Sequence, residues 1–269
     1  MLHIYIVSLQ QDIEKRRVIS ETLESFGLEF DFIDAIYGKE LSEDVTSIIR
    51  CKSTGKVASR GFSATPGEIG CTLSHLKAYQ TILDRNIDWA CILEDDIILD
   101  EKFEAFIRTF QATELDPTSL YLLGGQNGLS EDGIIKSIKN TKTVGGQKFS
   151  KTIKSEGLIH RTCCYLMSAC LAEKLIVLSQ EKFILADDWS YLVRNDVIKR
   201  IYLSKFVDHP LDLSNSHLQK ERELSALNKV SSSTSKKPSF PSRVKGAVKS
   251  RLRSPILKAY RYIEKKENV

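Results

Sequence analysis

The sequence predicts an α/β fold, in which helices cover a central β-sheet. The chain opens on a run of β-branched and aromatic residues, HIYIVSL at 3–9, which is typical of a central strand. Residues 29–35 alternate in polarity as a second strand would. Between them lie apolar residues at helical spacing and a glycine that would stop a helix: Ile19, Leu23, Phe26 and Gly27. A strand, a helix and a strand in this order indicate a βαβ unit.

The same alternation of elements continues along the chain. A helix should begin at Pro66, because Thr65 is a favourable N-cap and Glu68 can complete a capping box. Residues 51–64 are small and polar, which favours a mobile loop, and residues 126–156 are too polar to assign. Further strands are predicted at 89–95, 119–125, 158–168 and 199–207, and further helices at 101–110, 169–180 and 187–195.

The composition is that of a globular protein. Of 269 residues, 42% are apolar and 28% are charged, and no apolar run approaches the roughly 18 residues that span a bilayer. The N-terminus has neither the basic start nor the small-residue cleavage site of a signal peptide, so we expect a cytosolic protein. The six cysteines show no Cys-x-x-Cys spacing, which favours reduced cysteines packed as small hydrophobic residues over disulfides or a zinc site.

Charge is distributed unevenly along the chain. Residues 229–269 hold 12 Lys and Arg against two Glu, a charge of +10, so the net charge of +4 leaves −6 on residues 1–228. An acidic body with a basic tail does not fit a nucleic-acid-binding domain. We therefore divide the chain into a globular domain (1–228), a Ser-rich flexible linker (229–242) and a basic amphipathic tail (243–269).

The tail has the pattern of an amphipathic helix that lies on a membrane surface. Apolar residues recur every three to four positions among Lys and Arg, although Pro255 should interrupt the helix. The same pattern would also suit a surface helix that docks on its own domain. The charge of the tail and the length of the linker favour an anionic membrane surface as its partner.

The strand predicted at 89–95 runs into three adjacent acids, Glu94, Asp95 and Asp96. A solvated turn would explain them, but carboxylates at the end of a strand are also hard oxygen ligands for Mg²⁺ or Mn²⁺. Such an ion would offset the repulsion between the acids and bind a diphosphate. Alternation along a strand places Glu94 and Asp96 on one side and Asp95 on the other.

The preceding helix carries a second group of polar candidates, Glu68, Ser74 and His75. Ser74 and His75 point about 100° apart on a helix, so we do not expect both of them in the core. His75 fits either a structural role or a contact with a substrate. Glu68 is either the capping-box partner alone or a substrate contact as well.

The order of these motifs resembles glycosyltransferase family 25. GEIGCTLSHLKAY at 67–79, followed by ILEDDIIL at 92–99, is similar to two specific motifs of that family. IYIVSLQQDIEKRR is similar to its opening strand, with Ser8-Leu9 where Asn-Leu is usual, and TCCYLMSACLAEKLI and ILADDWSYL resemble later motifs. The resemblance covers residues 3–215. The family includes bacterial lipooligosaccharide galactosyltransferases and, more distantly, collagen galactosyltransferases.

The resemblance implies a GT-A-type fold, a nucleotide-binding α/β/α sandwich that uses a sugar nucleotide, commonly UDP-galactose. Glu94-Asp95-Asp96 would be its acidic signature, with Mn²⁺ or Mg²⁺ as the cofactor. The implied metal ligands are Asp96, Glu94 and a late histidine, His217 or His209. The implied donor-binding residues are Ser8, Leu9, Arg16, Glu94, Asp95 and Asp96, and Glu68, Ser74 and His75 would contact the donor or the acceptor.

The family is of the inverting type, in which an acceptor hydroxyl displaces the nucleotide in one step. Asp187 and Asp188 open a late helix and are the candidate bases, and plain N-capping is the alternative role for either. The implied acceptor is a lipid-linked oligosaccharide of lipooligosaccharide or lipopolysaccharide. Together with the basic tail, this implies a cytoplasmic protein that is peripheral on the inner membrane.

Two other functions fit the motifs less well. One is another metal-dependent enzyme that acts on phosphate, such as a nucleotidyltransferase or a phosphatase. A phosphatase of the haloacid type would carry its acidic motif on the first strand, where this chain has none. The other is a non-catalytic nucleotide-binding scaffold of the same fold, which would bind UDP without transferring a sugar.

Overall fold

The computed structural model describes residues 2–60, 63–113, 115–129, 131–212 and 221. Its centre is an eight-stranded mixed sheet in the order β2-β1-β3-β7-β4-β8-β6-β5. The strands are β1 (His3–Ser8), β2 (Asp31–Asp34), β3 (Trp89–Glu94), β4 (Leu120–Gly124), β5 (Lys136–Val144), β6 (Gln147–Thr152), β7 (Cys164–Ser168) and β8 (Ile201–Val207). The helices are α1 (Ile13–Ser25), α2 (Glu43–Lys52), α3 (Lys56–Arg60), α4 (Pro66–Asp84), α5 (Glu101–Thr109), α6 (Ala169–Glu181) and α7 (Trp189–Arg194). The predicted α/β fold is confirmed.

The βαβ unit predicted at the N-terminus is present, because β1 pairs in parallel with β2 and α1 connects them. β1 is a central strand, and alternate side chains enter the cores on its two faces. Ile4 and Ile6 pack on one face with α1, while Tyr5 and Val7 pack on the other with α4. This explains why the run is apolar throughout instead of alternating with polar residues.

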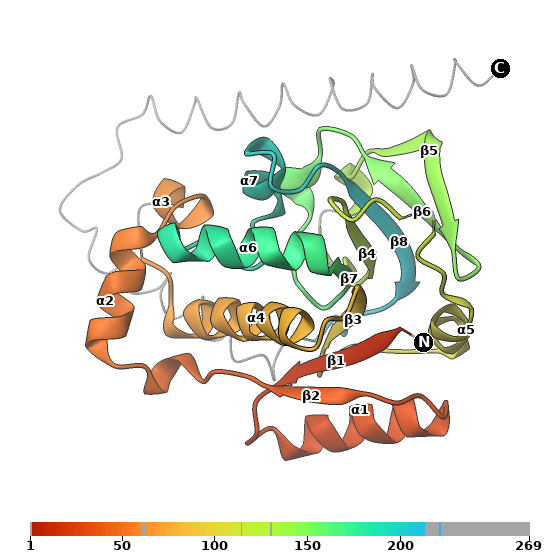
Figure 1. Cartoon of the computed structure of the whole chain (residues 1–269), viewed down its shortest axis with the longest axis horizontal. Coiled ribbons are helices and arrows are strands. Elements are labelled where there is room, and N and C mark those ends of the chain that lie inside the picture. Colours follow the sequence, from red (N-terminus) through yellow and green to blue (C-terminus); the bar gives the residue numbers. More distant parts are fainter. Residues whose placement is uncertain (1, 61–62, 114, 130, 213–220, 222–269) are drawn as a thin grey trace.

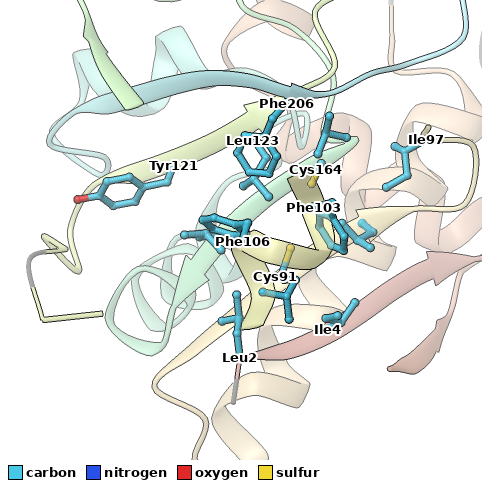
Figure 2. Close-up of a cluster of buried hydrophobic side chains, with 14 of the residues drawn as sticks. Leu2, Ile4, Cys91, Ile97, Phe103, Phe106, Tyr121, Leu123, Cys164 and Phe206 are labelled. Atoms are coloured by element: carbon cyan, nitrogen blue, oxygen red, sulfur yellow. The ribbon is translucent and has the colours of Figure 1, made fainter. Parts of the chain in front are cut away.

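Helices cover both faces of the sheet and make three layers (Figure 1). α1 and α5 cover one face, where Phe103 and Phe106 of α5 are fully buried beside strand residues (Figure 2). α4, α6 and α7 cover the other face, and α4 packs along α6. β1, β3, β4 and β8 run in the same direction, so their carboxyl ends meet at one edge of the sheet.

Helix α4 begins as the sequence predicts and is buried more deeply than expected. Thr65 is its N-cap and forms a complete capping box with Glu68. The loop after β2 packs against it so closely that a Cβ on Gly70 would lie 2.4 Å from the carbonyl oxygen of Ile36. Because this loop covers one side of α4 and the sheet covers another, Ser74 and His75 are both 1% exposed. The expectation that they could not both be buried was therefore wrong.

The loop predicted at 51–64 is largely helical, which corrects the sequence interpretation. α2 extends to Lys52, and α3 begins at Lys56 after Gly55, whose φ is +64°. The backbone N–H of Lys56 donates to the Asp188 carboxylate at 2.6 Å. The Asp188 carboxylate thus accepts a backbone N–H at the start of α3, which has no partner within that helix. The small polar residues of this segment give little helical signal in the sequence.

Two further stretches differ from the prediction. The unassigned segment 126–156 contains the β5–β6 hairpin, which extends the sheet beyond β8. The strand expected over 158–168 begins at Cys164, because Leu158 ends a short 3-10 helix and Arg161 has a φ of +64°, which a strand does not allow.

Part of the domain division lies outside the described residues. The end of the globular domain, the linker at 229–242, the tail at 243–269 and His217 all fall there, apart from the described Glu221. Among the helices that the structure describes, none has the length and apolar character needed to cross a membrane.

Candidate active site

A cavity of about 690 Å³ opens at the carboxyl ends of β1 and β3. The N-terminal half of α4 forms one wall, and the loop after β2, at 35–39, forms another. Residues 160–162 before β7 and the segment that leads into α7 close the remaining sides. Predicted site residues that line the cavity are Ser8, Leu9, Glu68, Ser74, His75, Glu94, Asp95, Asp96, Asp187 and His209.

Asp95 joins the acidic turn to the first strand and helix. Its carboxylate accepts a hydrogen bond from Ser8 Oγ at 2.6 Å and an ion-paired one from Lys15 Nζ at 3.3 Å. Burial raises the pKa of Asp95 above its ordinary value, and Lys15 and Ser8 act in the opposite direction. Both oxygens of the Asp95 carboxylate are thus engaged by protein groups.

Asp96 is the acid with an oxygen left for a ligand. Its Oδ1 is buried, forms no hydrogen bond within the described residues, and lies 3.6 Å from His209 Nε2. Burial and then repulsion from Glu94 raise the pKa of Asp96, and attraction to His209 and Lys15 only partly offsets them. A carboxylate oxygen and an imidazole nitrogen at this separation fit a divalent cation, which would stabilise the ionised carboxylate.

His209 lies beside the acidic turn, where the family resemblance implied that a late histidine would act as a metal ligand. It is 7% exposed, and its Nδ1 lies 2.8 Å from the carbonyl oxygen of Pro210. If Nδ1 donates to this carbonyl, the lone pair of Nε2 faces Asp96. An isolated bridge between Ile98 and Asp208 holds the chain just before the histidine against the segment after the acidic turn. His217 lies outside the described residues.

Glu94 faces a buried polar network instead of the first helix. His75 Nε2 lies 3.4 Å from its Oε1, and Thr162 donates a hydrogen bond to the same oxygen. Burial acts to raise the pKa of Glu94, but His75 and Thr162 hold it below its ordinary value. On its other side, His75 Nδ1 lies 2.7 Å from Tyr165 Oη, which lies 2.9 Å from Tyr79 Oη.

Arg16 supports the edge of the cavity and is not part of its lining. Its guanidinium donates to the backbone carbonyls of Ser8 and Leu9 and to the carboxylate of Asp34. It therefore fixes the turn that follows β1, including the two residues expected to contact the donor. The neighbouring Arg17 points to solvent and pairs with acids of its own helix.

The carboxylate of Glu68 is engaged by protein groups, although it lines the cavity. One oxygen accepts from Arg60 and from the backbone N–H of Thr65, and the other accepts from Arg60 as well. Ser74 is also engaged, because its hydroxyl accepts from the N–H of Ile36 at 2.8 Å and donates to Gly70. Both residues thus hold the walls together in the structure as described.

The two candidate bases are placed differently. Asp188 is 0% exposed, does not line the cavity, and caps α7 through the N–H of Tyr191. Asp187 lines the cavity with its side chain 17% exposed. The Asp187 carboxylate lies 3.8 Å from Lys56 Nζ and accepts a hydrogen bond from the Arg161 N–H at 3.3 Å. The capping role that the sequence allowed for either residue falls to Asp188.

Several basic residues of the cavity were not predicted. Lys15 lies one position before Arg16, and the helical pattern alone does not say which of the two faces the acids. Lys56 and Arg161 also line the cavity, and both come from segments whose backbone the sequence misassigned. Arg161 Nη1 donates to the carbonyls of Gly125 and Asn127, and this ties residues 160–162 to the end of β4.

The family of the chain is established by comparison with known proteins. A model described as "Glycosyltransferase family 25 (LPS biosynthesis protein)" matches residues 1–191. The chain therefore belongs to glycosyltransferase family 25, which confirms the resemblance found in its motifs. The matched residues include β1, β3, α3 and α4 of the cavity wall, whereas the lining residues His209 and Glu221 lie beyond the match.

Individual relatives are distant and longer than the matched part. A glycosyltransferase 25 family member of Aedes aegypti is 28% identical over 217 residues, which are 78% of this chain and 33% of that protein. Procollagen galactosyltransferase 1-B of Xenopus laevis is 29% identical over 125 residues, 44% of this chain and 20% of that protein. Lacto-N-neotetraose biosynthesis glycosyltransferase LgtB of Neisseria gonorrhoeae is 28% identical over 125 residues, 44% of this chain and 42% of that protein. The chain thus spans less than half the length of each of these relatives.

The raised pKa of Asp96 predicts that Asp96→Asn stabilises the metal-free protein at pH 7. Folding raises the pKa of this carboxyl, so the folded protein favours its protonated form. The stability that this preference contributes is present below the unfolded pKa and is lost as pH rises through the folded pKa. At pH 7 the ionised carboxylate therefore costs stability, and an amide removes that cost. The advantage of the variant should therefore shrink as pH falls toward 4 and vanish below the ordinary pKa of about 3.8. Urea unfolding in EDTA at several pH values measures this difference.

Asp132→Asn is the matched control, because Asp132 is exposed. Its effect should stay within about 0.5 kcal/mol at every pH. An Asp96→Asn protein that is less stable than the wild type at pH 7 would contradict the prediction. It would show that protein groups alone stabilise the ionised Asp96 carboxylate without a metal.

Proposed function

We propose that this protein is an inverting glycosyltransferase of the GT-A type that transfers a hexose, galactose from UDP-galactose, to an acceptor sugar. The observation that carries the proposal is the pairing of Asp96 with His209 on the wall of a cavity large enough for a sugar nucleotide. Asp96 Oδ1 is buried and has no hydrogen-bond partner in the part of the chain that the structure describes, which supports cation binding at this wall. Family membership supports the reaction class, and the procollagen galactosyltransferase among the relatives supports galactose.

The acidic turn would bind the donor through its diphosphate. Asp96 and His209 would hold Mn²⁺ or Mg²⁺, with Glu94 on its outer side, and the bound ion would neutralise the charge that develops on departing UDP. Lys15 lies 3.9 Å from Asp96 and provides a second positive charge beside the same wall. Asp95 would remain bound to Ser8 and keep the turn in position.

The catalytic base in this proposal is Asp187. It is the cavity-lining member of the predicted pair, and it lies on the wall formed by the segment that leads into α7. Its carboxylate accepts a hydrogen bond from the N–H of Arg161 and lies 3.8 Å from the ammonium of Lys56, and both contacts hold it at the cavity wall. An acceptor hydroxyl that attacks the anomeric carbon would lose its proton to this carboxylate.

Metal-dependent binding of UDP tests the donor site. We expect calorimetry to show UDP binding in Mn²⁺ that weakens at least about tenfold in EDTA or in Asp96→Ala. A series of UDP-sugars under the same conditions ranks the donors. Asp132→Ala should bind as the wild type does, because that residue is exposed and does not line the cavity. Equal binding with and without metal, by folded protein, would remove the basis of the proposal and favour a different phosphate-binding protein.

Asp187→Asn tests the base separately from the donor site. Loss of general base catalysis should lower kcat by about 10²–10⁴-fold, while UDP binding in Mn²⁺ stays unchanged. Asp188→Asn is the matched change at the neighbouring carboxylate, and it should lower thermal stability because both oxygens of Asp188 accept backbone N–H groups, from Lys56 and Tyr191, and an amide keeps only one acceptor. Sugar-transfer rates and UDP titrations on both variants make the comparison, and a nearly unchanged kcat in Asp187→Asn would exclude this residue as the base.

We further propose that the acceptor is a lipid-linked oligosaccharide, reached from the cytoplasmic side of a membrane. The relative that acts in lacto-N-neotetraose biosynthesis supports an oligosaccharide acceptor. The charge of +10 on residues 229–269 supports attachment to anionic lipids, since each basic residue near such a surface contributes about 1 kcal/mol before screening. The tail would then concentrate the enzyme beside its acceptor.

Deletion of residues 231–269 tests this attachment. The truncated protein should turn over a soluble acceptor at the wild-type rate and sediment much less with vesicles that contain anionic lipid. The difference between the two proteins should shrink at high salt, because the attraction is electrostatic. Unchanged vesicle binding, or full loss of soluble-acceptor activity in a folded truncation, would contradict a role limited to membrane attachment.

A further inference from the structure

A second group of metal-ligating side chains lies on the cavity wall beside the acidic turn. It consists of Cys71, His75 and Glu94, whose ligand atoms all lie within 4.8 Å of one another. Cys71 and His75 are four positions apart on α4, so they share one face of that helix, and Glu94 ends β3. All three residues line the cavity. The function proposed above uses neither Cys71 nor His75.

The imidazole of His75 is oriented as a metal ligand would be. His75 is 1% exposed, and its Nε2 is buried without a hydrogen-bond partner within the described residues. Its Nδ1 lies 2.7 Å from Tyr165 Oη, itself 2.9 Å from Tyr79 Oη. If Nδ1 donates to Tyr165, the ring is fixed and the lone pair of Nε2 points toward Glu94 and Cys71. Histidine ligands are commonly held in this way through their second nitrogen.

We propose that Cys71, His75 and Glu94 form a binding site for Zn²⁺. Around a tetrahedral zinc ion, nitrogen and oxygen ligands are separated by roughly 3.3 Å, and His75 Nε2 lies 3.4 Å from Glu94 Oε1. The sulfur must lie roughly 3.6 Å from each of them, so an approach of about 1 Å by the Cys71 thiol is enough to close the set. Because all three residues line the cavity, water or a ligand could complete the four ligands that zinc takes.

The donor set distinguishes this site from the one at Asp96. A thiolate and an imidazole favour Zn²⁺, whereas Mg²⁺ and Mn²⁺ favour oxygen ligands. One thiolate and one carboxylate neutralise the charge of Zn²⁺, which lowers the cost of holding these groups in a buried wall. Thr162 holds the Glu94 carboxylate toward this site through its hydrogen bond. Zn²⁺ bound here would sit directly beside the wall proposed to bind the sugar nucleotide.

Cobalt provides the direct test, because Co²⁺ occupies zinc sites and gives a thiolate-to-metal absorption band when sulfur is a ligand. We expect one equivalent of Co²⁺ to produce this band in the reduced full-length protein, and Zn²⁺ to displace it. Cys71→Ser should abolish the band and weaken Zn²⁺ binding by at least about 100-fold. Cys51→Ser, a change at an exposed cysteine on α2, should leave both unchanged.

Two further variants keep the test decisive. Glu94→Gln retains the thiol and should keep a thiolate band while weakening Zn²⁺ binding about tenfold or more, so it reports on the site even if Cys71→Ser fails to fold. Asp96→Ala should bind Zn²⁺ as the wild type does, which separates this site from the proposed donor site. No thiolate band in the wild type, or an equal band in folded Cys71→Ser, would overturn the proposal and leave His75 and Glu94 as a simple buried ion pair.

Discussion

The acidic turn after β3 places three carboxylates at a partly buried edge of the sheet, and much of the surrounding structure balances their charge. Their neighbours come from both ends of the described chain. Lys15 follows the first strand, while His209 follows the last one. Asp95 is bound by Ser8 and Lys15, whereas a buried oxygen of Asp96 has no hydrogen bond among the residues that the structure describes. This difference between adjacent residues makes the turn a candidate cation site instead of an ordinary acidic turn.

Helix α4 forms the wall next to the acidic turn, and its burial on two sides determines which of its polar atoms can reach a ligand. Most helices of α/β proteins bury one apolar stripe, but α4 packs against the sheet, α6 and the loop after β2. Gly70 permits the close approach of that loop, and Ser74 hydrogen-bonds to it. On the sheet side, His75 reaches Tyr165 and Glu94. Ser74 and His75 of α4 thus form buried contacts with neighbouring elements. Only some of their polar atoms remain available to bind a ligand.

The described cavity places two kinds of metal ligand on adjacent walls. Oxygen from Asp96 and nitrogen from His209 suit the cation of a sugar-nucleotide donor, and sulfur from Cys71 with nitrogen from His75 suits zinc. Glu94 lies between the two groups, because it contacts His75 and repels Asp96. Binding at one site would alter the electrostatic field at the other, because Glu94 interacts with both His75 and Asp96.

The sequence alone determined the α/β class, the first βαβ unit, the capping box of α4 and the family. These features depend on local patterns: apolar periodicity, N-cap chemistry at Thr65, and two motifs that are contiguous in the chain. Only the tertiary structure decided that Asp187 faces the cavity while Asp188 caps a helix, that Lys15 rather than Arg16 meets the acids, and that α3 exists. Each of these outcomes depends on a contact with a residue far away in the sequence. Neighbouring positions on a helix face different directions, so local patterns do not show which of two adjacent residues makes that contact.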